Sequence, residues 1–262
     1  MFKPILSYWS FWNSLAFRLR NLLRFSRSGL NIFPEDLEGL FAGEKLEKES
    51  FLIDRFQLAS YKKREKKENY LDNLLYLELL DFCLGDREFS NEPLRVLDVG
   101  ARDWFYAGAL WHFFSFAGDS SRSVRVTGFE LDPYLTYIDG HSRLDFARFF
   151  SRDLPGMDYR SIDFLLCEEK ADVVTIFHPF LRSYEHLEGG LPLSCFYPKD
   201  LILHSYSLLK EGGYLVIVNF DYETKMLLEL LEELGMKVFR RGDWFSELAD
   251  RPARHAAVVT KE

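Results

Sequence analysis

Residues 94–104 read LRVLDVGARDW, an apolar run that ends in an acid and a glycine. Short apolar runs bounded by turn residues are typical of buried strands. Further runs follow, separated by stretches of helical periodicity, and this alternation is typical of βαβ units in a parallel sheet. We expect strands at 94–99, 124–130, 147–151, 172–178 and 214–219, and helices at 104–117, 133–145, 157–169 and 198–210.

The C-terminal part of the chain adds one helix and two strands. Residues 226–234 have a strong helical pattern that ends at Gly235, and short strands are expected at 236–240 and 255–261. Because no helical pattern separates the last two strands, we expect antiparallel pairing there. The predicted fold class is therefore α/β, a doubly wound, mostly parallel seven-stranded sheet with an N-terminal helical extension.

The first 30 residues predict one amphipathic helix that ends at Gly29. Its apolar side chains fall on one arc: Tyr8, Phe11, Trp12, Leu15, Leu19, Leu22 and Leu23. Residues 1–34 hold five cations and no acid. This segment therefore carries +5 and the rest of the chain −13, because the net charge is −8. Three interpretations are open: the apolar arc packs on the protein's own body as a lid or cap, it makes peripheral contact with a membrane surface, or the segment is a targeting peptide.

A second N-terminal helix is predicted by leucines at helical spacing up to Phe82, with Gly85 as its C-terminal cap. The polar, turn-rich stretch from Gly85 to Pro93 follows it. We place the domain boundary there, which divides the chain into a helical extension or cap, residues 1–90, and a sheet domain, residues 91–262.

Composition excludes several classes of protein. The 262 residues include 25 Phe, 13 Tyr and 5 Trp, enough large side chains to form a core, and no apolar run reaches the length of a membrane span. The net charge of −8 argues against DNA as a partner. Three scattered cysteines and the absence of a metal-ligand motif favour a reducing, cytoplasmic location and no metal site.

Acids lie at the predicted carboxyl ends of the first three strands, where open parallel sheets bind their ligands. Asp98 ends the first strand, Glu130 the second, and Asp153 follows the predicted third. A carboxylate after the second strand can accept hydrogen bonds from both hydroxyls of a ribose, as in dinucleotide-binding folds. By the same logic, Asp153 could accept an adenine amino group, and Asp98 could order a water or an ammonium group.

Residues 92–262 resemble a class I S-adenosylmethionine-dependent methyltransferase. Five pieces match in order: VLDVG at 96–100, VTGFELD at 126–132, RDLP at 152–155, ADVVT at 171–175 and LLKEGGYLVIV at 208–218. The resemblance implies the strand order 3-2-1-4-5-7-6 and S-adenosylmethionine as cofactor. The cofactor-binding residues it implies are Asp98, Gly100, Ala101, Arg102, Trp104, Glu130, Leu131, Asp153, Leu154 and Phe177.

The first loop departs from the family's glycine-rich pattern, because Arg102 and Trp104 stand where glycines are usual. Glycine tolerates positive φ and close backbone approach, so both substitutions require the loop to take another path. Either the two side chains fill the pocket and the protein is a catalytically inactive binding or scaffold module, or they are reused. In the second case Arg102 pairs with the cofactor's carboxylate, and the Trp104 ring lies near its sulfonium.

Histidine at the end of the fourth strand supplies the candidate catalytic base. The ordinary pKa of His178, about 6.5, suits proton transfer from an acceptor. The long connection 180–198 carries aromatic residues and could enclose an acceptor. We therefore expect methyl transfer to a small-molecule, lipid-linked or glycan acceptor.

Overall fold

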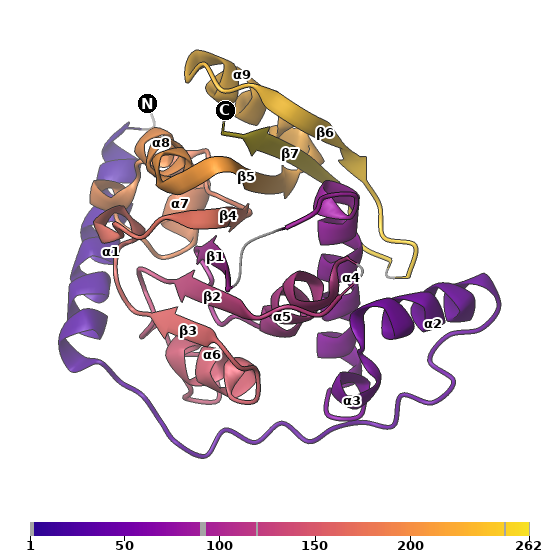
Figure 1. Ribbon diagram of the computed structural model, residues 1–262. Helices are drawn as coiled ribbons and strands as arrows, with labels where there is room; N and C mark the ends of the chain where they lie inside the picture. Colours follow the sequence, from indigo (N-terminus) through magenta and orange to yellow (C-terminus); the bar gives the residue numbers. More distant parts are fainter. Residues whose placement is uncertain (1–2, 90–92, 119, 249, 262) are drawn as a thin grey trace.

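The strands pair in the order β3-β2-β1-β4-β5-β7-β6 and form one seven-stranded sheet in the computed structural model, which describes residues 3–89, 93–118, 120–248 and 250–261 (Figure 1). Their bounds are β1 Leu94–Val99, β2 Val124–Phe129, β3 Met157–Arg160, β4 Ala171–Phe177, β5 Leu209–Phe220, β6 Val238–Trp244 and β7 Arg254–Thr260. The pairs from β3 to β5 are parallel, and β7 is antiparallel to both β5 and β6. The predicted fold class and strand order are confirmed.

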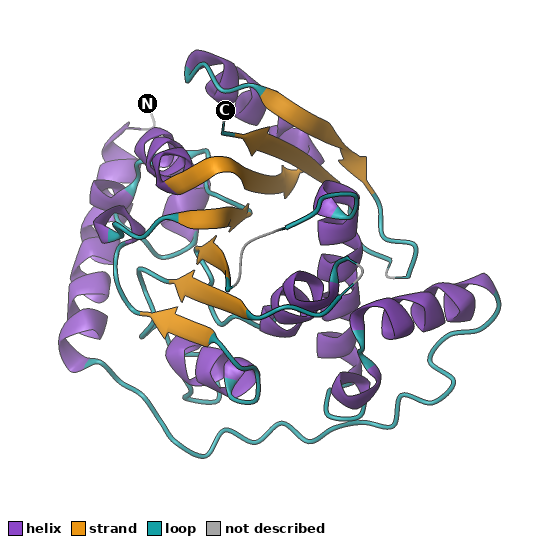
Figure 2. Ribbon diagram, viewed as in Figure 1, coloured by secondary structure: helices purple, strands orange, loops and turns teal. Residues whose placement is uncertain are grey.

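Helices cover both faces of the sheet (Figure 2). The α-helices are α1 Lys3–Leu23, α2 Glu44–Phe56, α3 Ala59–Lys62, α4 Lys67–Leu84, α5 Ala107–Phe116, α6 Arg143–Ser151, α7 Ser183–Glu188, α8 Pro198–Leu208 and α9 Thr224–Glu233, and the 3-10 turns are η1 Phe164–Leu166, η2 Leu193–Cys195 and η3 Asp221–Glu223.

Each buried strand contributes to two cores, because successive side chains point to opposite faces of the sheet. Val96 packs in one cluster with α4 and α5, and Leu97 packs in another with α8 and α9. All of β4 is buried, which explains why its residues are apolar except Asp172 and Thr175.

The third strand lies later in the chain than predicted. Residues 147–151 belong to α6, whose N-terminus has a capping box in which Ser142 and Asp145 each accept a backbone N–H of the other. The predicted helix at 157–169 is instead β3 followed by η1, and most of the predicted helix at 133–145 is loop. Gly156, at φ 80°, makes the turn into β3 where a Cβ would lie 2.1 Å from the Val124 carbonyl oxygen. The apolar residues at 147–151 therefore belong to a short amphipathic helix, and the prediction of a strand there is wrong.

Helix α1 docks with the opposite face from the one expected. Asn13 donates to the carbonyl oxygens of Leu187 and Leu191, and Arg20 binds the buried Asp132 through two hydrogen bonds of 3.0 and 2.6 Å. The predicted apolar arc faces solvent instead, with every one of its seven side chains about half exposed or more. Self-packing of that arc is wrong. Also, α1 ends at Leu23, before the predicted stop at Gly29.

The helices α2 to α4 share a hydrophobic cluster with the sheet. Asn73 of α4 connects them to the first βα unit: its Nδ2 donates to the Phe105 carbonyl oxygen, and its Oδ1 accepts the Ala109 N–H, both at 2.8 Å. The predicted boundary between residues 90 and 91 lies outside the described residues. The division into two domains stays a prediction.

Replacing Asn73 with alanine should lower the free energy of unfolding by about 1–3 kcal/mol, because it leaves the buried Ala109 N–H and Phe105 carbonyl without a partner. Urea denaturation at neutral pH measures the loss. Asn69→Ala is the matched control, since the Asn69 side chain, one turn earlier, bonds the side chain of Glu65 and contacts Tyr61, and it bonds neither Phe105 nor Ala109 in the described part of the chain. Equal losses in the two variants would contradict the bridging role of Asn73.

Candidate functional site

The carboxyl end of β1 carries a fully buried acid, Asp98. Its Oδ1 accepts the Thr175 hydroxyl of β4 at 2.6 Å, and its Oδ2 accepts the Trp104 indole N–H at 2.9 Å and the Tyr106 hydroxyl at 2.8 Å. Burial raises the pKa of Asp98 to about 6, against the opposing effect of these three hydrogen bonds. Side chains of the protein thus take the place of the water or ammonium group expected beside Asp98.

The loop after β1 keeps the left-handed backbone of a glycine-rich loop with fewer glycines. Gly100 has φ 76°, and Arg102 and Trp104 both have φ 53°. Side chains with a Cβ are strained there, so the surrounding contacts have to compensate. The Arg102 N–H donates to Glu130, its carbonyl oxygen accepts the Tyr159 hydroxyl, and the Trp104 N–H donates to the Ala101 carbonyl oxygen.

Trp104 lies inside the protein, and Arg102 lies outside it. The indole is fully buried against β2, where a Cβ on Gly128 would be 2.8 Å from the ring and 3.1 Å from the Ala101 methyl group. The Arg102 side chain is exposed. At Gly100 the same test finds no atom within 4 Å, so the start of the loop has open space beside it.

Glu130 follows β2 and is 4% exposed. Its Oε2 accepts the Arg102 N–H at 2.9 Å, and its Oε1 accepts the Asp132 N–H at 2.8 Å and Arg143 Nη1 at 3.0 Å. An ionised carboxylate has about four acceptor positions. One position, on Oε2, thus stays available to a hydroxyl. The neighbouring residue, Leu131, is half-buried.

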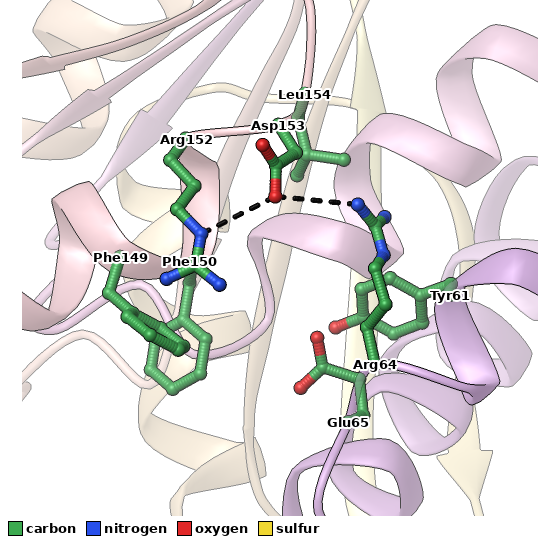
Figure 3. Close-up of a pocket in the computed structure, with 8 residues that line it drawn as sticks. All are labelled: Tyr61, Arg64, Glu65, Phe149, Phe150, Arg152, Asp153 and Leu154. Carbon is green, nitrogen blue, oxygen red and sulfur yellow. Dashed lines mark hydrogen bonds and ion pairs between the residues drawn. The ribbon is translucent and has the colours of Figure 1, made fainter. Parts of the chain in front are cut away.

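Asp153 and Leu154 lie before β3 and not after it, so their predicted place at the carboxyl edge is wrong. Figure 3 shows them among the residues that line a small cavity. Its volume, about 20 Å³, is enough for one water molecule. The exposed Asp153 carboxylate pairs there with Arg64 and Arg152. The error follows directly from the misplaced third strand.

The acid that follows the observed β3 is Asp163. Its Oδ1 accepts the Leu165 N–H at 3.0 Å and its Oδ2 accepts the Tyr197 hydroxyl at 2.5 Å. Asp163 is an acid just after a strand, like Glu130. It was not predicted because the third strand was expected at 147–151 and not at Met157–Arg160.

Aromatic rings gather where β4 ends. Phe177 meets Tyr76 and Tyr106 edge to face, with ring centroids 5.0 and 5.3 Å apart, and Tyr76 stacks on Tyr106 at 4.4 Å. Tyr76 belongs to α4, so the N-terminal region contributes a wall to this edge of the sheet. This role of Tyr76 could not be predicted from the sequence, because its position in an apolar helix signals only core packing.

His178 comes directly after β4 with φ 55°, and its ring stacks on Phe220 at 4.5 Å. Its Nδ1 is buried and finds no hydrogen-bond partner among the described residues. Burial, and then the charges of Arg254 and Arg102, lower the pKa of His178 to about 3. The imidazole is therefore neutral at pH 7 and is a much weaker base than its ordinary pKa suggests.

Asn219 of β5 lies beside His178, because Phe177 pairs with Val218 and the His178 N–H donates to the Val218 carbonyl oxygen at 2.7 Å. Its side chain is fully buried, yet neither amide atom has a hydrogen-bond partner in the part of the chain that the structure describes. Orphaned buried amides are costly unless a ligand or water satisfies them. Asp103 Oδ1, in the first loop, is another such atom.

These groups fit a polar ligand that carries hydroxyls and a carboxylate. Glu130 offers an acceptor position, the Arg102 guanidinium is exposed, and open space lies at Gly100. Asp103 Oδ1 and His178 Nδ1, which are buried and have no hydrogen-bond partner among the residues the structure describes, lie on the β1 and β4 sides of the same edge. S-adenosylmethionine has the groups that this set can bind.

The buried His178 should make the protein less stable in acid. The unfolded chain binds a proton at His178 below about pH 6.5, whereas the folded protein does so only near pH 3. The free energy of unfolding should therefore fall by about 1–3 kcal/mol from about pH 7 to about pH 4.5 through this group. In His178→Asn, which tolerates positive φ, that part of the decrease should disappear.

Urea denaturation of both proteins at the two pH values isolates this effect. Asp98, with its raised pKa, contributes in the opposite direction, but it is present in both proteins and cancels in the difference. The same pH dependence in both proteins would show that His178 is not held in its neutral form.

Comparison with known proteins supports the fold. No protein-family model matches the sequence, and the search of curated proteins gave no match. Among solved structures, a chain of the Haloferax volcanii complex that contains the Trm112 methyltransferase activator is similar over 74% of this chain and 92% of its own, with a TM-score of 0.50 at 13% identity.

Two further solved structures are similar at lower TM-scores. A SAM-dependent methyltransferase from Aquifex aeolicus covers 83% of this chain and 98% of its own, with a TM-score of 0.49 at 14% identity. TrmN from Thermus thermophilus covers 72% of this chain, with a TM-score of 0.46 at 17% identity, and the match spans about half, 48%, of that protein. With its strand order, the chain has the Rossmann-like fold of class I S-adenosylmethionine-dependent methyltransferases.

Proposed function

We propose that the protein transfers a methyl group from S-adenosylmethionine to a small-molecule, lipid-linked or glycan acceptor in the cytoplasm. The observation that carries the proposal is Glu130, a buried carboxylate after β2 with one acceptor position left, beside a strained loop at Gly100–Trp104. Both lie at the carboxyl ends of the strands, close to the point between β1 and β4 where the strand order reverses. Open α/β sheets bind their ligands at such a point.

Each part of the cofactor has a counterpart in the chain. Glu130 would accept a ribose hydroxyl, Leu131 would pack on the nucleoside, and the open space at Gly100 and Ala101 would hold the methionine part, with Arg102 pairing its carboxylate. Asp163, in place of Asp153, would accept the adenine amino group. The bound cofactor supplies an electrophilic methyl group, so the protein's task is to align the acceptor with it.

Trp104 has a different role from the one its sequence position suggested. Because its indole N–H binds Asp98 and its ring packs on Gly128, it supports the loop from beneath. The aromatic wall of the cleft would then be Phe177, with Tyr76 and Tyr106 behind it.

His178 and Asn219 would hold the acceptor. The neutral imidazole can hydrogen-bond a hydroxyl or an amine through Nδ1, and the amide of Asn219 adds one donor and one acceptor. With a pKa of about 3, His178 orients the attacking atom and takes up a proton only as the new bond forms.

Binding of the cofactor is tested by thermal unfolding of the full chain with S-adenosylmethionine or S-adenosylhomocysteine at about 1 mM. The melting temperature should rise, since a ligand at about 100 times its dissociation constant stabilises the folded state by about 2.7 kcal/mol. Glu130→Gln should lose this shift. The control Asp153→Asn should keep it, because that carboxylate lies at the other end of β3.

The same experiment tests the alternative of an inactive binding or scaffold module. Its support is that protein donors already occupy Asp98 and most of Glu130. If neither ligand shifts the melting temperature of the unmodified protein, the methyltransferase proposal fails. A shift that survives in Glu130→Gln would instead remove Glu130 from the site.

A further inference from the structure

The outward side of α1 is an apolar surface with no covering element in the described part of the chain. We call it the α1 face, and its side chains are Ile5, Tyr8, Phe11, Trp12, Leu15, Leu19, Leu22 and Leu23. Each is between 49% and 78% exposed. Their spacing forms one continuous stripe along a helix of 21 residues, about 30 Å long. An apolar stripe of this length that is exposed to solvent marks an interaction site.

The opposite side of α1 fixes this orientation. Arg20 binds Asp132 and the Gly190 carbonyl oxygen, Asn13 donates to one carbonyl oxygen in α7 and one just after it, and the Ser10 hydroxyl accepts the Leu193 N–H at 2.9 Å. The Asp132 side chain is fully buried, so this ion pair cannot be released without leaving an uncompensated charge inside the protein. The helix is thus held with its apolar stripe toward solvent. It lies at one side of the molecule (Figure 1).

Charge around the α1 face selects the partner. Arg18 lies at the rim of the stripe, Arg24 and Arg27 follow the helix, and all three are exposed. Residues 1–34 contain no acid, whereas the rest of the chain carries −13. A surface of negative charge would therefore attract this face and repel the remainder of the molecule.

We infer that the α1 face binds the surface of a membrane that contains anionic lipids, with α1 lying in the interface. Helices that bind this way carry aromatic and leucine side chains on the buried face and arginines beside it. A second copy of the chain fits less well, because pairing two α1 faces would bring both sets of arginines together without an acid from either segment. In the described residues, no helix is long and apolar enough to cross the membrane.

Membrane contact would also place the candidate site. Asp132, which holds α1, follows Glu130 by two residues and donates its backbone N–H to that carboxylate. The carboxyl edge of the sheet therefore lies next to the docked helix, within reach of molecules at the membrane surface. The inference itself rests on α1 and not on the proposed methyl transfer.

Flotation of the full chain with vesicles tests the inference. Vesicles of phosphatidylcholine with about 30% phosphatidylglycerol should bind the protein, vesicles of phosphatidylcholine alone should bind it at least about tenfold more weakly, and about 0.5 M NaCl should weaken binding to the anionic vesicles. On binding, the tryptophan fluorescence should shift to shorter wavelength as Trp12 enters the interface. No methyl donor is present, so the result is independent of the proposed function.

The double variant Phe11→Glu/Leu15→Glu should lose at least about tenfold in binding while its melting temperature stays unchanged, because both side chains are exposed. Leu166→Glu/Phe245→Glu is the matched control, with two equally exposed apolar residues outside the α1 face, and it should bind as the unmodified protein does. Undiminished binding of the first variant, or no preference for anionic vesicles, would overturn the inference. The inference would also be overturned if the unmodified protein formed a dimer in solution and bound no vesicles, and if the first variant were a monomer.

Discussion

A buried carboxylate at the end of β1 connects the parts from which the candidate site is made. Asp98 accepts hydrogen bonds from β4, from the first loop and from the residue before α5. Since it is fully buried, each of these donors is needed to compensate for the water that the carboxylate has lost. Two neighbouring strands and the loop between β1 and α5 are thereby fixed to one point, and the positions of Glu130 and His178 depend on it.

The same interaction explains how a glycine-poor loop is tolerated. A tryptophan with φ 53° is strained, but its indole gains a charged acceptor in Asp98 and a flat surface at Gly128. Glycine at 128 is thus the counterpart of tryptophan at 104, because a side chain on β2 would collide with the ring. Glycine at this position of β2 leaves room for the close approach of the Trp104 ring.

Much of this architecture was predictable, because β1, β2, β4 and β5 are buried on both faces and read as apolar runs. The third strand was not, because a five-residue stretch such as 147–151, with its two phenylalanines, suits a short helix equally well. The local sequence signal for a helix at these residues, α6, was the capping box at Ser142 and Asp145. The docking of α1 had no local signal, since the choice between its two faces depends on Asp132, more than one hundred residues away. The lowered pKa of His178 likewise depends first on its burial in the folded chain, and then on the charges of Arg254 and Arg102 from other segments.

The contacts of α1 also set an order of events during synthesis. The helix docks on Asp132 and on residues 187–193, which are made later than the helix itself. At about 5–20 residues per second, at least about 5 s separate the helix from Asp132, and at least about 8 s separate it from residues 187–193. Throughout that interval both sides of the helix are without their protein contacts. A helix whose partners are made this much later has time to meet a surface in the cell before the sheet has folded.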